Sequence, residues 1–136
     1  MSLDPKNSLT FTSVLPPLSR ATNNAASAGV DLRSGGPYEG ACCVIVNVGA
    51  QTAGDNAMTF TTLLQSAANN TASEATNISG ASYVTGGNNA ASYLGQIQFD
   101  PRACFRYLFA RTVITAGNSP AAPTSAVLIG QKKKVS

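Results

Sequence analysis

The chain contains no histidine, no tryptophan and few charged residues, which make up 11% of its 136 positions against roughly 25% in a typical soluble domain. Without histidine, Ser-His-Asp and Cys-His catalytic arrangements are excluded, and the commonest metal ligand is absent. Without tryptophan, the chain lacks the largest ring that can stack on a sugar. A polar surface with so little charge provides weak repulsion between copies, which is typical of a protein that remains bound to a partner.

Cysteine is also scarce, and its spacing argues against thiol chemistry. Cys42 and Cys43 are adjacent in the stretch ACCVIVNVG, so on a strand they point to opposite faces and cannot hold one metal ion together. Cys104 is the only other thiol, no Cys-x-x-Cys spacing occurs, and an odd count argues against a disulfide framework. We therefore expect the thiols to pack as small apolar side chains.

The sequence predicts no enzyme and no cofactor. The glycine-rich stretches 34–37 and 86–89 lack the lysine and hydroxyl residue of a phosphate-binding loop and are predicted to be turns. The six carboxylates lie far apart, mostly in or beside predicted turns, and do not favour a glycosidase pair. They are Asp4, Asp31, Glu39, Asp55, Glu74 and Asp100.

Short apolar segments with a period of two recur along the chain, separated by Gly, Pro and Asn. In 103–115, for example, Phe105, Tyr107, Phe109 and Val113 are predicted to share one face. Only 63–75 has a weak helical period. The predicted strands are Leu9–Leu15 (ending at Pro16-Pro17), Ala28–Leu32, Cys42–Val48, Met58–Leu64, Ala75–Val84, Tyr93–Phe99, Ala103–Thr115 and Ala126–Ile129.

This pattern predicts an all-β fold, an antiparallel β-sandwich or barrel of about eight strands, in a single domain over residues 1–136. Residues 1–20 are predicted to form an extended N-terminal arm and residues 131–136 a basic C-terminal tail. No secretory signal and no apolar run of membrane-spanning length is visible, so we expect no membrane association.

The two ends supply the candidate partner contacts. Without Lys132, Lys133 and Lys134 the remaining six basic residues equal the six acidic ones, so the net charge of +3 belongs to the tail. Three lysines can help the chain settle on an acidic surface but do not form a nucleic-acid groove. The predicted contact residues are Leu9, Phe11, Leu15, Arg20, Lys132, Lys133 and Lys134.

Six short motifs follow one another along the chain. They are Gly29-Val30-Asp31-Leu32-Arg33, Tyr38-Glu39-Gly40, Val44-Ile45-Val46-Asn47-Val48-Gly49, Leu64-Gln65-Ser66, Phe105-Arg106-Tyr107-Leu108 and Ala126-Val127-Leu128-Ile129-Gly130. Taken in order, they resemble small structural proteins of tailed bacteriophages that are encoded near the major capsid protein. The resemblance covers most of the chain from Leu15 onward. Relatives usually continue the Gln-x-Ser stretch with acidic residues, where this chain has Ala67-Ala68-Asn69-Asn70.

The resemblance implies a virion component made in the reducing bacterial cytoplasm, with a jelly-roll-like sandwich. The leading hypothesis is a capsid decoration, cement or minor head protein that binds the major capsid protein between capsomers and self-associates, a trimer being one arrangement. One alternative is a neck, tail-tube or head-tail adaptor protein present in few copies. A second is a glycan- or receptor-binding module on the virion surface, with Tyr38, Tyr83 and Tyr93 at its site.

Overall fold

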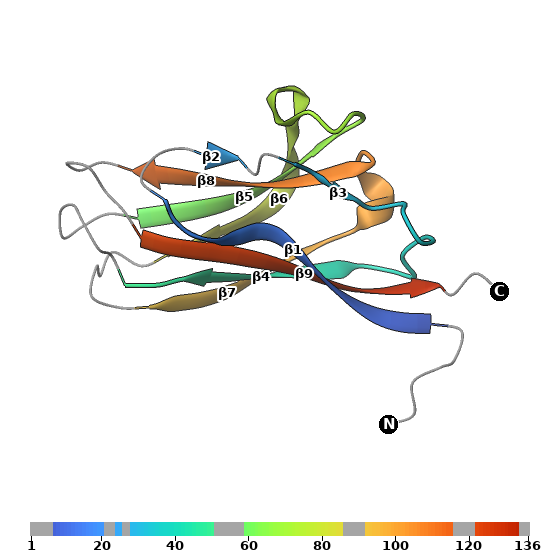
Figure 1. Ribbon diagram of the computed structural model, residues 1–136, viewed down its shortest axis with the longest axis horizontal. Helices are drawn as coiled ribbons and strands as arrows, with labels where there is room; N and C mark the ends of the chain where they lie inside the picture. Colours follow the sequence, from blue (N-terminus) through green and yellow to red (C-terminus); the bar gives the residue numbers. More distant parts are fainter. Residues whose placement is uncertain are drawn as a thin grey trace.

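The protein is a sandwich of two antiparallel β-sheets in a computed structural model that describes residues 7–20, 24–25, 28–50, 59–85, 92–115 and 122–133 (Figure 1). Short 3-10 turns occur at Ala72–Glu74 and Pro101–Ala103. The strands are β1 (Asn7–Arg20), β2 (Asn24–Ala25), β3 (Val30–Asp31), β4 (Cys42–Val48), β5 (Thr59–Ala67), β6 (Thr76–Val84), β7 (Tyr93–Phe99), β8 (Tyr107–Thr115) and β9 (Ala122–Lys133). The predicted all-β sandwich is confirmed.

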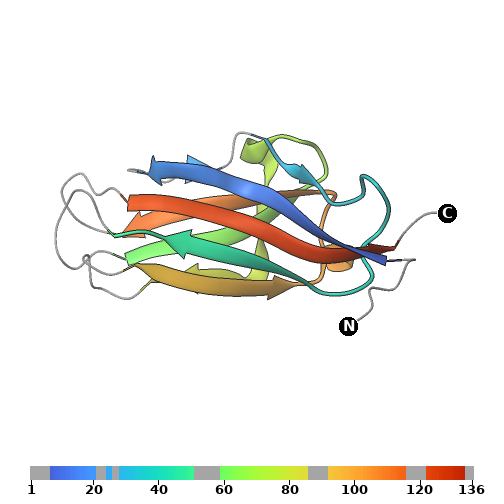
Figure 2. The same ribbon diagram turned by 60° about the horizontal axis from the view of Figure 1, so that its bottom comes forward.

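The strand order is that of a jelly roll. Sheet A has the order β1-β9-β4-β7, as Figure 2 shows, and sheet B has the order β2-β8-β5-β6, with β3 also paired to β8. β2 and β3 both pair with β8 and occupy one position in sheet B. The antiparallel pairs are nested in the sequence, with the β5–β6 pair innermost, then β4 with β7, β3 with β8 and β1 with β9. Successive pairs alternate between the two facing sheets, as in a jelly roll.

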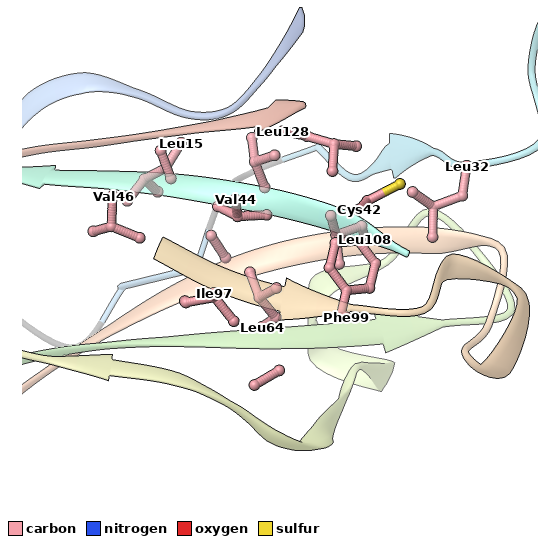
Figure 3. Close-up of a cluster of buried hydrophobic side chains, with 14 of the residues drawn as sticks. Leu15, Leu32, Cys42, Val44, Val46, Leu64, Ile97, Phe99, Leu108 and Leu128 are labelled. Carbon is pink, nitrogen blue, oxygen red and sulfur yellow. The ribbon is translucent and has the colours of Figure 1, made fainter. Parts of the chain in front are cut away.

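The core lies between the sheets and comes from alternate positions of the strands, as the period of two requires (Figure 3). In β4, Val44 and Val46 are fully buried while Asn47 is exposed. Phe60 and Leu64 of β5 point into the same core, and Ile97 and Phe99 do so from β7. Met58, predicted to share the face of Phe60, lies outside the described residues.

Strand β1 is longer than the sequence predicts, because it does not end at Pro16-Pro17 but continues to Arg20. Proline is tolerated here because β1 is the edge strand of sheet A. The pairing with β9 shifts register between Ser13 and Leu15 and again between Leu15 and Leu18. These bulges turn the consecutive residues Val14 and Leu15 both into the core.

The prediction for 103–115 is wrong at its start, whereas Tyr107, Phe109 and Val113 do share one face of the strand. Strand β8 begins at Tyr107, after the 3-10 turn, and Phe105 is exposed. Leu108 and Ala110 fill the inter-sheet core, so Phe109 points to the other side of sheet B. The stretch 63–75, which has a weak helical period, begins as a strand, since β5 continues to Ala67.

The predicted C-terminal tail is in part a strand. β9 runs to Lys133 and pairs with the start of β1, with Lys132 opposite Ser8 and Lys133 opposite Asn7. The predicted glycine turn at 34–37 is confirmed by Gly35 and Gly36, whose φ angles of 77° and 110° lie in the region that favours glycine. The turn predicted at 86–89 lies outside the described residues.

Candidate docking face on sheet A

The outer face of sheet A is built from rows of side chains that cross all its strands. Two rows carry most of its apolar surface. They are Phe11–Ile129–Cys43–Gln98 and Ser13–Val127–Ile45–Gln96, with Leu9 and Gln131 beyond the first and Ser125, Asn47 and Leu94 beyond the second. Cross-strand register therefore gathers side chains that are far apart in the sequence.

This face is unusually apolar for a surface, and its described side chains carry no charge. Leu94 is 73% exposed, Phe11 66% and Leu9 50%, while Ile45, Val127 and Ile129 are half-buried. Its polar members are Ser, Asn and Gln, which can hydrogen-bond without requiring a counter-ion. A contiguous apolar patch with a neutral polar surround is typical of a protein-binding surface.

The structure places the predicted contact residues in different environments. Leu9 and Phe11 lie on the open face of sheet A, as a contact role requires. Leu15 does not, because the bulge turns it fully into the core, and this part of the prediction is corrected. Arg20 and Lys133 are strand residues whose side chains are not among those described, and Lys134 lies outside the described residues.

Lys132 is bound within the fold rather than extended from a tail. Its ammonium lies 4.9 Å from the centre of the Tyr38 ring and donates a hydrogen bond to the carbonyl of Ser34. Tyr38 in turn packs against Gly130, where an added Cβ would lie 2.6 Å from both the Tyr38 ring and Cys42 Sγ. Lys132 therefore fastens the 34–38 turn to the end of β9.

Sequence reasoning missed most of the docking face. Ile45, Val127, Ile129 and Leu94 were assigned to strands but not to an exposed surface. Their alternation with the buried residues of β4, β7 and β9 was the available signal. In each strand, one set of alternate side chains faces solvent and the other faces the second sheet. The sequence of a single strand does not show which set faces solvent, because that depends on where the second sheet packs.

The adjacent thiols lie on opposite sides of sheet A, as their spacing predicts. Cys42 is buried in the core, and burial raises the pKa of its thiol to about 11. Cys43 is half-buried on the outer face, and burial also raises its pKa. A raised pKa reduces the thiolate fraction at neutral pH, so both sulfurs act as packing groups.

Several of the described carboxylates have local partners. Asp31 accepts two hydrogen bonds from the Arg106 guanidinium, at 3.0 and 2.8 Å, and these hydrogen bonds lower the pKa of Asp31 to about 2. Asp100 is paired with Arg102 at 3.0 Å, and Glu74 accepts from Asn69. Among the described residues, no group of three or more Cys, Asp or Glu side chains is arranged to hold a metal ion.

The tyrosines proposed for a glycan site are packed against the protein. Tyr38 is buried, and Tyr83 and Tyr93 are partly buried against the core. Tyr83 covers Gly95 so closely that an added Cβ would lie 2.2 Å from its ring. These rings are used within the fold, and none of the three is fully exposed.

The outer face of sheet B differs, because the chain covers it at Phe109. Phe109 is 0% exposed although it points away from the inter-sheet core. Gly29 lies on its ring, with space for no Cβ, and the Gly29 N–H donates to the Asn70 side chain at 2.6 Å. The Asp31–Arg106 ion pair fastens the same segment beside β8.

In the described part of the chain, no helix combines the length and apolar character required to cross a membrane. No protein-family model matches the chain, and no curated protein is similar to it in sequence. A solved structure described as that of infectious bursal disease virus, Gx strain, is similar in fold, with a TM-score of 0.46 and 10% identity over 98% of this chain. The chain spans 36% of the length of that protein.

Proposed function

We propose that the protein is a structural component of a bacteriophage virion, of the capsid decoration type, that docks through the outer face of sheet A. The observation that carries the proposal is the apolar face formed by the two cross-strand rows and the residues beside them, on which no described side chain is charged. The jelly-roll order of strands and the resemblance of the motifs to small phage structural proteins support it. No catalytic step is proposed.

The partner is the major capsid protein at the outer surface of an assembled shell. An apolar face whose described side chains are uncharged suits this partner because a lattice presents the same surface many times, and each contact can be modest when many copies bind together. Small side chains such as Ser125 and Asn47 around the apolar rows allow close approach. Bound copies stabilise the shell by mass action, because they bind the assembled form and not the dissociated one.

The first test is the copy number of this chain in purified particles, relative to the major capsid protein, by quantitative mass spectrometry. Hundreds of copies are expected for a shell-covering protein. A dozen or fewer would assign it instead to a neck, tail-tube or adaptor position, and absence from particles would overturn the virion role.

The second test measures binding of the purified protein to shells that lack it. Leu94→Lys and Ile45→Lys place a charge on the docking face and are expected to reduce binding at least tenfold, because the lysine is desolvated in the interface. Val84→Lys is the matched control, since Val84 is 55% exposed but lies on sheet B. Equal binding by all three variants would assign docking to another surface.

A further inference from the structure

The outer edge of β1 is available for another strand. β1 pairs with β9 along one side, and no strand of the described residues pairs with its other side. An edge strand presents unpaired backbone N–H and C=O groups, and natural proteins usually block such an edge with prolines, charges or bulges.

The two halves of β1 differ in this protection. The half from Val14 to Arg20 contains both bulges, both prolines and a charged residue. The half from Asn7 to Ser13, with sequence NSLTFTS, has none of these and keeps a regular register with β9 throughout. On its outer face Leu9 is 50% exposed and Phe11 66%. An unguarded edge beside two exposed apolar side chains is the geometry that adds a further strand.

We propose that residues 7–13 pair antiparallel with the same residues of a second copy, about a two-fold axis at Thr10. In this register Leu9 lies opposite Phe11 of the second copy, and Phe11 opposite its Leu9. On the other face, Thr10 lies opposite its equivalent. Each exposed apolar residue of this segment therefore meets an apolar residue of the second copy.

The absence of charge favours a second copy as the occupant. Near a two-fold axis each charged group approaches its own equivalent, which is destabilising, and residues 7–13 contain no charged group. Directly opposite residues place their side chains on the same face of a sheet, so odd-numbered residues of one copy must pair with odd-numbered residues of the other. The two nearest alternative registers therefore have their two-fold axis at Leu9 or at Phe11. An axis at Leu9 places Phe11 opposite Asn7, and an axis at Phe11 places Leu9 opposite Ser13, so the register at Thr10 is preferred.

The pairing enlarges the docking face. Sheet A continues from β7 through β1 into β1 of the second copy, and the two uncharged outer faces become one surface. A contact of a single strand pair is smaller than a standard protein interface, so the dimer is expected to dissociate on dilution. The pairing requires neither a shell nor any other virion protein.

Disulfide cross-linking of the purified chain tests the pairing. Leu9→Cys and Phe11→Cys are made separately in a background of Cys43→Ser and Cys104→Ser, and then oxidised alone and as an equal mixture. The mixture is expected to yield a dimer containing one of each variant, because directly opposite residues suit a disulfide. Each variant alone is expected to yield little, since identical cysteines would lie roughly 8 Å apart between Cα atoms.

The other outcomes are equally decisive. Efficient cross-linking of Phe11→Cys with itself would overturn the register at Thr10. Cross-linking of the mixture no greater than that of a Leu94→Cys and Val84→Cys mixture, together with a monomer by sedimentation at all concentrations, would overturn self-pairing. If Leu9→Cys or Phe11→Cys were linked to capsid protein instead when shells were added, the edge would belong to a strand of that protein. Since the first assay contains no shells, its failure is distinct from failure of the docking proposal.

Discussion

Two phenylalanines on the outer faces of the two sheets have opposite environments. Phe109 on β8 is 0% exposed because Gly29 and the 69–70 loop lie over it, whereas Phe11 on β1 is 66% exposed with no described segment over it. Both residues belong to strands whose other face fills the core. Where the chain covers its own sheet, an outward aromatic residue contributes to stability, and where it does not, the same residue type is available to a partner.

The largest expected effect separates these two rings. Phe109→Ala is expected to lower the free energy of unfolding by about 3–5 kcal/mol, because it leaves a cavity beneath Gly29. Phe11→Ala is expected to change it by less than about 0.5 kcal/mol, since its ring is already solvated. Urea denaturation followed by circular dichroism measures both. A loss of similar size at Phe11 would mean that residues of the chain outside the described set cover the docking face.

A smaller effect is expected from closing the space above Phe109. In Gly29→Ala the new Cβ would lie 2.7 Å from the ring, so the covering segment must move, at a cost of about 1–3 kcal/mol. Gly40→Ala is the control, because no atom lies within 4 Å of its added Cβ. Equal unfolding midpoints for the two variants would show that Gly29 does not seal the ring.

Buried threonines distinguish the inner sides of the same two sheets. Thr62 and Thr112, opposite one another in sheet B, are buried with no hydrogen-bond partner for either hydroxyl. Thr124 in sheet A donates to the carbonyl of Ala122 at 3.3 Å. Thr112→Val is therefore expected to stabilise the fold by about 1 kcal/mol, whereas Thr124→Val removes a bond and is expected to destabilise it by about 1 kcal/mol. Thermal unfolding of both variants measures the contrast, and a loss of stability in Thr112→Val would contradict it.

The smallest effect on stability concerns charge, which sheet B carries at Asp31 and Arg106 and which no described side chain on the outer face of sheet A carries. The Arg106 hydrogen bonds hold the pKa of Asp31 at about 2, below the value of 3.8 for a free carboxyl. Between about pH 4 and 2 the unfolded chain binds more protons than the folded one. The Asp31–Arg106 pair therefore adds to the free energy of unfolding above pH 4, and this added stability is lost as the pH falls to about 2. The added stability is small because the pair is partly solvated. Asp31→Asn is expected to lose less stability than the native chain over this window, and identical pH profiles would argue against the pair.

The sequence predicts most of the strands because each is bounded by turn residues and has a period of two. Cys42–Val48 and Tyr93–Phe99 coincide with β4 and β7. The errors arise where tertiary context decides. Pro16-Pro17 ends no strand because β1 lies at an edge, and Phe105 is exposed because the chain turns at Pro101–Ala103 before β8 begins.

The docking face was predictable only in part. Leu9 and Phe11 were chosen for their place near the N-terminus, and the structure exposes both on the outer face. The rest of the face depends on which strands are neighbours in sheet A, since β1, β9, β4 and β7 are distant in the chain. The sequence predicts Lys132 to be a partner contact in a basic tail, but its bond to the Ser34 carbonyl depends on a turn almost a hundred residues earlier.

The nested pairing of strands also determines when the protein can fold during its synthesis. Asn7 pairs with Lys133, so β1 leaves the ribosome long before β9 and must wait for it before it acquires its neighbour in sheet A. Pairs so distant in sequence form slowly, and until then the apolar residues of β1 remain exposed on the nascent chain. Because several ribosomes translate one message, neighbouring nascent chains present the same unguarded strand to one another, and copies of this protein can meet before either has finished folding.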